Sequence, residues 1–454
     1  MKYVKLCTAV LLVLVMLIVG VVPAFAYEPQ GVDVYAQAAL VVDLDRDIVV
    51  YEKNADTKMY PASLTKIMTA MVVLDECSDP SAVTVTAAYE ALDPLYGTDS
   101  SVCGLETGEE MTVLDLVSVM MIQSANDAAN VLAYHFGGED LSAFNDKMNK
   151  KAAELGLKNT HYTNAHGLHD SEHYTTARDL YILIDYAMQN PLFKEIVTSL
   201  YYIIPETNVH YEQTVDSTVL LQNPGEPDYY YEYAAGIKTG YTDAAGLCLT
   251  STATKDGTTY LCVVLNCPTE NKGCQFTLSK SLYEWAFDAL EYRTVINTET
   301  IVGEQAVKFG KGCETVPAVL QTAVESTVPK AIVADAIQSH VTWDAEQVEA
   351  PITKGQKLGT AVITAGNVTL GTVDVVASAD VQKSMWKVIG DALNRFFANP
   401  LVRFAVVVLV ILLVLVLLFS AYVLWARDQN RKRRRRRAER RRRLQEQQQN
   451  QINR

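Results

Sequence analysis

One stretch of the chain restricts its architecture more than any other. From Phe404 to Val423 almost every residue is Val, Leu, Ile, Phe or Ala. An α-helix rises about 1.5 Å per residue, so about 20 such residues cross the hydrocarbon core of a bilayer. We therefore expect a transmembrane helix over residues 404–425.

The segment after this run is strongly basic. Between Arg427 and Arg443, twelve residues are Arg or Lys and two are acidic. The positive-inside rule then predicts that the tail, residues 427–454, is cytoplasmic. A basic run beside a span usually contacts anionic lipid, so we expect lipid as its partner rather than nucleic acid. The net charge is −14 in spite of this tail, so the part before the span is acidic, which also disfavours nucleic acid.

The first 26 residues have the features of a secretory signal. Lys2 and Lys5 precede an apolar run from Leu6 to Val22, and Ala24-Phe25-Ala26 forms a small-x-small cleavage site. An uncleaved N-terminal anchor is the alternative, because the apolar run is long for a signal. Either way, the domain that follows is expected outside the cytoplasm.

Neither the cysteines nor the histidines predict a metal site. Seven cysteines remain after the signal, an odd number, and the sequence has no Cys-x-x-Cys pair. Cys267 and Cys274 are spaced to close a short loop, but the sequence leaves their pairing open. His169 and His173 have the i, i+4 spacing of helical zinc ligands, yet the glycine and aspartate around them indicate a loop.

A Ser-x-x-Lys pair begins a predicted helix. Ser63 and Lys66 stand at the start of an apolar run that continues to Leu74. Residues three apart share a helix face, so the serine and the lysine are expected to meet. A lysine can remove the serine proton if burial lowers its pKa. The spacing is sensible for a nucleophile and its base, but common by chance.

Two later stretches add weight to this pair. Ser124-Ala125-Asn126 lies between two helical runs, and Lys238-Thr239-Gly240 lies in a predicted strand. Ser-x-x-Lys, Ser-x-Asn and Lys-Thr-Gly, in this order, form the motif set of penicillin-binding proteins and class A β-lactamases. Each motif is common alone, whereas the ordered set is specific.

The chain resembles the D-alanyl-D-alanine carboxypeptidases, the low-molecular-mass penicillin-binding proteins, over roughly residues 30–385. Besides the three motifs, Asn164-Ala165-His166-Gly167-Leu168 and Ala350-Pro351-Ile352-Thr353-Lys354-Gly355-Gln356 match the family. The resemblance implies a peptidoglycan stem peptide as substrate, covalent binding of β-lactams, and neither metal nor organic cofactor.

The resemblance also implies roles for individual residues. Ser63 would attack the carbonyl between the two terminal D-alanines, and Lys66 would take its proton. Ser124 would pass a proton to the leaving D-alanine while Asn126 holds the peptide amide.

The lysine motif would supply the remaining contacts. Lys238 and the Thr239 hydroxyl would bind the terminal carboxylate, and Gly240 would leave room for the substrate beside the strand. The backbone N–H groups of Ser63 and Tyr241 would form the oxyanion hole.

The sequence departs from the family pattern in two places. Relatives often carry Arg-Phe before the last helix of the catalytic domain, whereas this chain has Gln275-Phe276. If that Arg helps to bind the substrate carboxylate, Lys238 contributes more of that binding here. Relatives usually end in an amphipathic anchor, whereas this chain adds a full span and a basic tail.

The order of the predicted elements indicates an α+β fold. A hairpin of Ala38–Val42 and Ile48–Tyr51 comes first, helices fill the middle, and a hairpin of Leu247–Ala253 and Thr258–Leu265 comes near the end. Distant strands that share one sheet around a helical insert are typical of α+β domains. The family adds a β-lactamase/transpeptidase-like arrangement, an antiparallel sheet with a helical region.

We therefore expect six parts in the chain. They are a signal peptide (1–26), a catalytic domain (27–296), a small all-β domain (297–380) with Val- and Thr-rich runs such as Ala331–Val333, an amphipathic or linker helix (384–399), the span (404–425) and the tail (427–454).

Two other functions stay open at this level. A serine β-lactamase uses similar motifs, but no clear Glu-x-x-Leu-Asn run lies between Ser124 and Lys238 to supply its second base. A membrane-anchored wall-binding or penicillin-sensing protein without turnover is the alternative from another class. The third residue of the stem peptide and any endopeptidase activity are not readable from the sequence.

Overall fold

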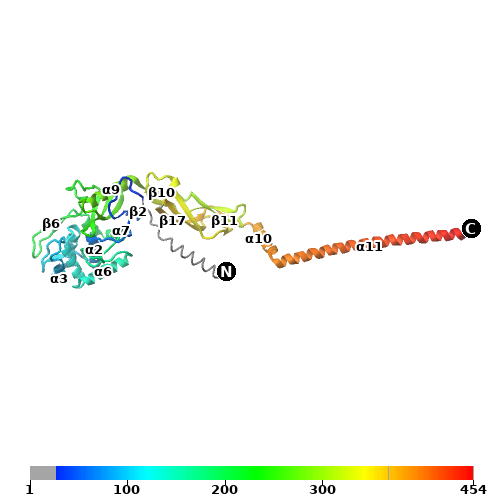
Figure 1. Cartoon of the computed structure of the whole chain (residues 1–454), viewed down its shortest axis with the longest axis horizontal. Helices are drawn as coiled ribbons and strands as arrows, with labels where there is room; N and C mark the ends of the chain where they lie inside the picture. Colours follow the sequence, from blue (N-terminus) through cyan, green and yellow to red (C-terminus); the bar gives the residue numbers. More distant parts are fainter. Residues whose placement is uncertain (1–26, 367, 453–454) are drawn as a thin grey trace. The chain divides into compact units, whose positions relative to one another are not determined.

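A computed structural model describes residues 27–366 and 368–452 (Figure 1). The expected signal peptide therefore lies outside the described residues. The chain divides into two compact units, one with residues up to 300, 320–342 and 360–374, and one with residues 301–319, 343–359 and 375–454. Every residue of the candidate site below belongs to the first unit.

The first unit is built around a five-stranded antiparallel sheet. Its strand order is β2-β1-β9-β8-β7. The strands are β1 (Ala38–Asp43), β2 (Ile48–Lys53), β7 (Ala234–Thr242), β8 (Gly246–Lys255) and β9 (Thr258–Cys267). Ala38 of β1 pairs with Leu265 of β9, so the first strand pairs with the last one of the sheet. This pairing confirms the α+β prediction.

The two predicted hairpins are present. β1 pairs with β2, and β8 pairs with β9. The β8–β9 turn places Asp256 at φ 51° and Gly257 at φ 81°. Positive φ at both central residues defines the two-residue turn that Asp-Gly favours, because its twist matches that of the flanking strands.

Both faces of the sheet are covered. All six residues of β1 are buried. Alternate side chains of a strand point to opposite faces, and Leu40 joins the core cluster of the helical region while Val41 joins the cluster that contains Trp285. Figure 1 shows α9 (Cys274–Ala289) on one side of the sheet and the helical region on the other. The helix after β9 therefore covers one sheet face.

The helical region lies between β2 and β7 in the chain. It comprises the 3-10 turns η1 (Ala62–Leu64), η2 (Asp93–Leu95) and η3 (Leu220–Gln222), the helices α2 (Thr65–Glu76), α3 (Tyr89–Leu92), α4 (Val113–Ile122), α5 (Asn126–Phe136), α6 (Leu141–Glu154), α7 (Ala177–Met188) and α8 (Pro191–Val197), and the short strand pairs β3 (Thr84–Thr86) with β4 (Glu110–Thr112) and β5 (Tyr201–Ile204) with β6 (Gln213–Asp216).

The helix boundaries have local causes. The Thr112 hydroxyl accepts a hydrogen bond from the Asp115 N–H, and Asp115 accepts from the Thr112 N–H, which is a capping box at the start of α4. Asn190 caps α8 in a similar way and is followed by Pro191 at the first helical position. These caps fix where α4 and α8 begin.

The region after α9 is rich in strands, as predicted. β10 (Leu290–Ile296) pairs with β13 (Val324–Pro329). A six-stranded sheet has the order β14-β16-β17-β12-β11-β15. Its strands are β11 (Ile301–Lys308), β12 (Thr315–Leu320), β14 (Ile337–Trp343), β15 (Val348–Glu349), β16 (Lys357–Ala365) and β17 (Val368–Ala377).

One predicted strand of this region is wrong. Ala331–Val333 forms a turn before the 3-10 segment η4 (Ala334–Ala336), and the Ile332 N–H donates to the Pro329 carbonyl. Val333 is 64% exposed, so this apolar run has neither a strand partner nor a core to bury it. Its β-branched residues alone did not make it a strand.

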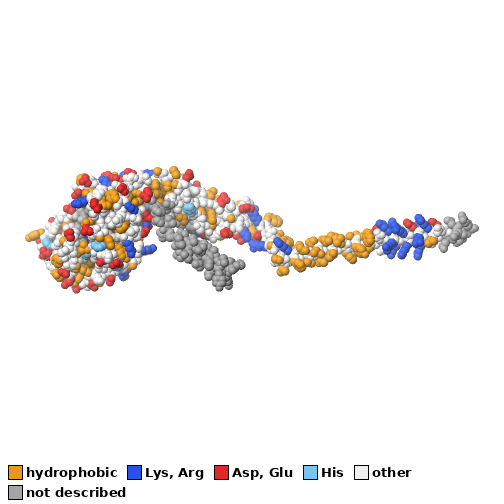
Figure 2. Space-filling model, viewed as in Figure 1, with side chains coloured by type: hydrophobic (Ala, Val, Ile, Leu, Met, Phe, Trp, Pro, Cys, Tyr) orange, Lys and Arg blue, Asp and Glu red, His pale blue; other side chains and the backbone are white. Residues whose placement is uncertain are grey.

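Two helices end the chain. α10 (Met385–Ala398) begins at the Ser384 cap, and its apolar side chains, such as Trp386 and Phe396, are exposed. α11 (Pro400–Ile452) contains the predicted apolar run and is the single helix of the described residues that is long and apolar enough to cross a membrane. Figure 2 shows its apolar stretch followed by a cluster of Lys and Arg.

Candidate active site

Ser63 lies in a tight turn at the start of the central helix. The predicted α-helix begins as the 3-10 turn η1, and α2 follows from Thr65. Ala62, directly before the serine, has φ 49°, a conformation that costs free energy for a residue with a Cβ. The Thr65 hydroxyl holds this turn by donating to the Ala62 carbonyl at 2.8 Å.

Two glycines allow other segments to approach this turn. A Cβ on Gly167 would lie 1.8 Å from the Ala62 carbonyl oxygen, and the residue has φ +92°. A Cβ on Gly240 would lie 3.0 Å from the Pro61 carbonyl oxygen and 3.3 Å from the Ser63 nitrogen. Strand β7 therefore runs directly beside the backbone of the serine.

Lys66 is the centre of the polar contacts. Its Nζ lies 3.0 Å from Oγ of Ser63, so the i, i+3 contact expected from the sequence is present. Nζ also donates to Oδ1 of Asn126 at 2.6 Å and to the carbonyl of His166 at 2.9 Å. Lys66 has no exposed surface, and these three groups are its hydrogen-bond partners among the described residues.

The environment of Lys66 favours its neutral form. Burial, and then the positive charge of Lys238, hold the pKa of Lys66 well below its usual value. The Asp127 carboxylate acts in the opposite direction, but more weakly. That carboxylate is itself occupied, since it accepts hydrogen bonds from the N–H groups of Gly104 and Leu105.

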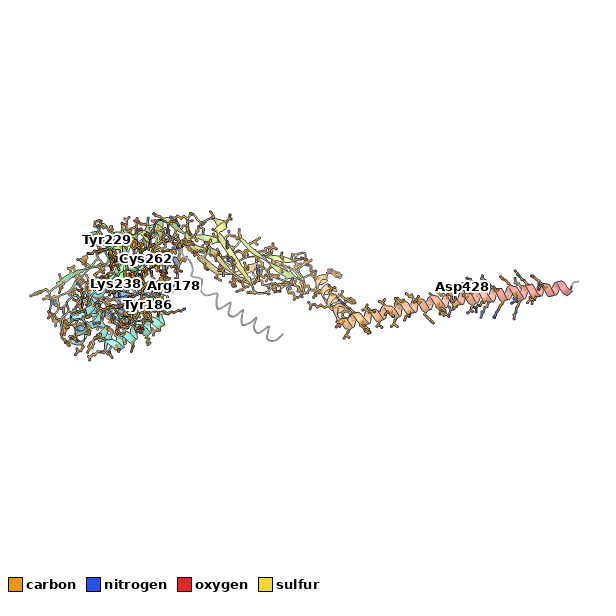
Figure 3. All side chains as sticks on the ribbon, viewed as in Figure 1. Arg178, Tyr186, Tyr229, Lys238, Cys262 and Asp428 are labelled. Carbon is orange, nitrogen blue, oxygen red and sulfur yellow. The ribbon has the colours of Figure 1, made fainter. Side chains whose placement is uncertain are left out.

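Lys238 is also buried. It lies within β7 in the interior of the unit (Figure 3), and its Nζ donates to the Thr239 carbonyl at 3.2 Å. Burial lowers the pKa of Lys238 to about 7. This lysine is therefore only partly charged near neutral pH.

The Ser-x-Asn motif joins two helices. Ser124 follows α4 with φ 71°, and Asn126 is the first residue of α5. Both side chains are buried apart from small areas that face the cavity. The break between the helices thus brings the serine and the amide to the same side as Lys66.

A cavity of about 750 Å³ opens above these groups. Six of the eight residues predicted from the motifs line it, and the buried Lys66 and Lys238 lie outside its lining. The six are Ser63, Ser124, Asn126, Thr239, Gly240 and Tyr241. All three motifs therefore meet at one cavity.

Several residues of the cavity had no predicted role. His166 supplies a carbonyl to Lys66 and a ring to the cavity wall, and burial lowers the pKa of its imidazole to about 3. Thr218 accepts a hydrogen bond from the Thr239 hydroxyl at 2.7 Å. The family-like stretch Asn164–Leu168 could have pointed to His166, whereas no motif surrounds Thr218.

The histidines with zinc-like spacing have other partners. Nδ1 of His173 accepts from the Thr163 N–H at 3.0 Å, and its Nε2 lies 2.7 Å from the Thr65 hydroxyl. The His169 ring packs edge-on against Tyr60. No group of three or more potential ligands that could hold a metal ion is found in the part of the chain described here.

Comparisons with known proteins agree with this geometry. A family model described as D-alanyl-D-alanine carboxypeptidase matches residues 24–269, and one described as the penicillin-binding protein 5 C-terminal domain matches residues 290–383. D-alanyl-D-alanine carboxypeptidase DacF of Bacillus subtilis is 30% identical over 77% of this chain and 86% of its own length. DacC of Escherichia coli is 31% identical over 74% and 82%.

A solved structure shares the fold. The crystal structure of the D-alanyl-D-alanine carboxypeptidase DacD from Francisella tularensis covers 79% of this chain and 97% of its own, with a TM-score of 0.64 and 24% identity. The family models cover both the domain that holds the three motifs and the strands that follow it. The chain therefore belongs to the family of serine-type D-alanyl-D-alanine carboxypeptidases.

Proposed function

We propose that this protein removes the terminal D-alanine from peptidoglycan stem pentapeptides through an acyl-enzyme on Ser63. The observation that carries the proposal is the set of contacts around Lys66 Nζ: Ser63 Oγ at 3.0 Å, Asn126 Oδ1 at 2.6 Å and the His166 carbonyl at 2.9 Å. Two of these three neighbours can only accept hydrogen bonds.

This arrangement suits a neutral amine. An uncharged lysine has two N–H groups and one lone pair, whereas a charged lysine has three donors and no acceptor. The two carbonyl oxygens take both N–H groups, so the lone pair is left for the Ser63 hydroxyl proton. The lowered pKa of Lys66 favours this uncharged form. Lys66 is thus the general base that activates the nucleophile.

The other motif residues complete the reaction. Ser63 Oγ bonds to the carbonyl carbon between the two D-alanines, and the C–N bond to the last D-alanine breaks. Ser124 passes the proton to the leaving amine, and the Asn126 amide holds the peptide. Water then hydrolyses the ester and restores the Ser63 hydroxyl.

Strand β7 supplies the electrostatic contacts. The N–H groups of Ser63 and Tyr241 form the oxyanion hole, which the close approach of Gly240 to the Ser63 nitrogen supports. Loss of one such donor typically costs about 2.7–4 kcal/mol of transition-state stabilisation. Lys238, when charged, and the Thr239 hydroxyl bind the terminal carboxylate.

A β-lactam reacts with the same serine in this scheme. Its strained amide takes the place of the D-alanyl-D-alanine bond, and we expect the acyl-enzyme to persist because the sequence between Ser124 and Lys238 has no clear Glu-x-x-Leu-Asn run to supply the second base of a β-lactamase. Sustained nitrocefin hydrolysis would instead indicate a β-lactamase, and one slow acylation per molecule is expected here.

The flanking parts place this reaction at a membrane. We infer that residues 27–296 are the catalytic domain outside the cytoplasm and 297–380 the small β domain that follows. The exposed apolar side chains of α10 lie on the membrane surface, α11 crosses the bilayer over 404–425, and the Arg-rich tail contacts anionic lipid on the cytoplasmic side.

The test uses the full chain in detergent. Incubation with a Lys- or diaminopimelate-containing pentapeptide should release D-alanine, and mass spectrometry after brief penicillin exposure should show one penicilloyl group on Ser63. Ser63→Ala should abolish both. A penicilloyl adduct without D-alanine release would favour a penicillin-sensing protein instead.

A further inference from the structure

A side-chain oxygen of one cavity residue has no hydrogen-bond partner in the part of the chain that the structure describes. Gln275, in the first turn of α9, lines the cavity and is only 7% exposed. Its Oε1 is buried and makes no hydrogen bond to any described residue. Buried amide oxygens are almost always paired, so an unpaired one in a substrate cavity indicates a contact that a ligand completes.

The rest of the cavity wall has a matching character. Oε1 of Gln123, which also lines the cavity, is a second buried acceptor without a partner. Asp99 and Asp243 line the wall as well, whereas none of its described lining residues is Lys or Arg. The wall therefore carries negative charge and two amide side chains whose buried oxygens are unpaired, and its positive charge is confined to the lysines buried behind it.

The sheet register places Gln275 on the β7 side of the cavity. Tyr241 of β7 pairs with Leu247 of β8, which pairs with Cys267 at the end of β9, and α9 begins soon afterwards. Leu247 and Phe276 line the cavity together with Gln275. Under the proposed function, this is the side where the terminal group of the leaving residue binds, next to Thr239.

We propose that Gln275 determines which terminal group the site accepts on the leaving residue, and that it admits a carboxamide there as well as a carboxylate. A side-chain amide can donate to a carboxylate through Nε2, but its oxygen then stays unpaired. A terminal carboxamide satisfies both ends, because its N–H donates to Oε1 while its oxygen accepts from Nε2. An arginine, with donors only, would favour the carboxylate strongly.

The reaction with an amidated peptide is the same as with a free acid. Ser63 Oγ bonds to the carbonyl carbon, the C–N bond breaks, and D-alaninamide leaves with the proton that Ser63 lost. Water then releases the shortened peptide and returns a proton to Ser63. A terminal carboxamide carries no charge, so its binding does not require the charged form of Lys238, which is only partly populated near pH 7.

The inference rests on the proposed function, so its test uses two substrates. The full chain in detergent is given N-acetylated Lys-D-Ala-D-Ala with a free carboxylate or with a terminal carboxamide. Release of D-alanine and of D-alaninamide is measured by mass spectrometry, and kcat/KM is compared. For the natural protein we expect the two kcat/KM values to agree within about tenfold. A tenfold ratio corresponds to a difference of about 1.4 kcal/mol between the two peptides.

Two substitutions test the residue itself. Gln275→Arg should raise the preference for the carboxylate peptide by at least about tenfold, and Gln275→Glu should reverse it, because a second carboxylate repels the first. Melting temperatures show that each variant is folded, and the ratio of the two substrates cancels any general loss of activity.

The outcomes separate the two proposals. If the carboxylate peptide is cleaved and the carboxamide peptide is cleaved more than about tenfold more slowly, or if Gln275→Arg leaves the ratio unchanged, the role of Gln275 is wrong and the carboxypeptidase function stands. Cleavage of neither peptide overturns the carboxypeptidase function, and the inference with it.

Discussion

The Nζ atom of Lys66 lies closer to Oδ1 of Asn126, at 2.6 Å, than to Oγ of Ser63, at 3.0 Å. The amide therefore orients the amine, and the serine meets the side of Nζ that the two carbonyl contacts leave free. In this geometry Asn126 contacts the proposed base directly, a contact that the Ser-x-Asn spacing alone does not reveal.

Replacement of Lys66 should remove the base without removing the nucleophile. Lys66→Met keeps a side chain of similar length but no proton acceptor. A positioned general base contributes roughly 10²–10⁴-fold, so acylation by a fluorescent penicillin should slow by about that factor. The rate of labelling, measured by gel fluorescence over time, checks this. Labelling at the natural rate would show that another group takes the serine proton.

Substitution of Asn126 by Asp should change the pH dependence in a defined direction. A carboxylate beside Lys66 favours the charged amine and raises its pKa. Less neutral amine is then present at pH 7, so the acid limb of the kcat/KM profile moves to higher pH. Asn126→Ala, which removes the acceptor without adding charge, is the control. Equal upward shifts in both variants would contradict the electrostatic explanation.

Much of this site could be predicted from the sequence, because the motifs bring their own geometry. Ser63 and Lys66 meet through helical spacing, and Lys238-Thr239-Gly240 lies in a strand, as its neighbours indicate. The contacts that depend on packing were missed. The His166 carbonyl reaches Lys66 only because Gly167 lets its loop touch the Ala62 turn, and no local pattern encodes that approach.

The lowered pKa of Lys238 predicts a second limb in the pH profile. A carboxylate substrate needs the charged amine, which is lost as the pH rises above about 7. For the free-acid peptide, kcat/KM should therefore fall at alkaline pH with a midpoint of about 7. Lys238→Arg keeps its charge at all these pH values, so its alkaline limb should move upward. An unchanged limb in the arginine variant would assign the titration to another group.

Gly167 should tolerate no side chain. Alanine there meets the Ala62 carbonyl at 1.8 Å and has an unfavourable φ, so Gly167→Ala should destabilise the fold and displace Ser63. Gly108 is a matched control, with φ +88° and nothing within 4 Å of a Cβ. We expect Gly167→Ala to melt several degrees below Gly108→Ala and to lose penicillin labelling, as measured by thermal melting and adduct formation. Equal melting temperatures for the two variants would show that the loop around Gly167 accommodates the alanine side chain without loss of stability.

The fold was predictable to the extent that its signals are local. Alternation and turn residues identified the β1–β2 and β8–β9 hairpins, and the apolar run identified α11. The failure at Ala331–Val333 has the same origin, since a short Val-rich run is a strand only if a partner and a core are present. β1 and β9 are far apart in the sequence, so no local pattern indicates that they pair. Their pairing was expected only because strands at the two ends of the domain, around a helical insert, are typical of an α+β fold.

The pairing of Ala38 with Leu265 also bears on how the protein is made. The opening hairpin leaves the ribosome with a strand that is apolar on both faces, and the neighbour that shields it is synthesised only after the whole helical region. Until then its hydrogen-bonding edge is open to other chains. The sheet can therefore close only after the chain has been made as far as β9, so its first strand is among the last parts of the domain to be shielded.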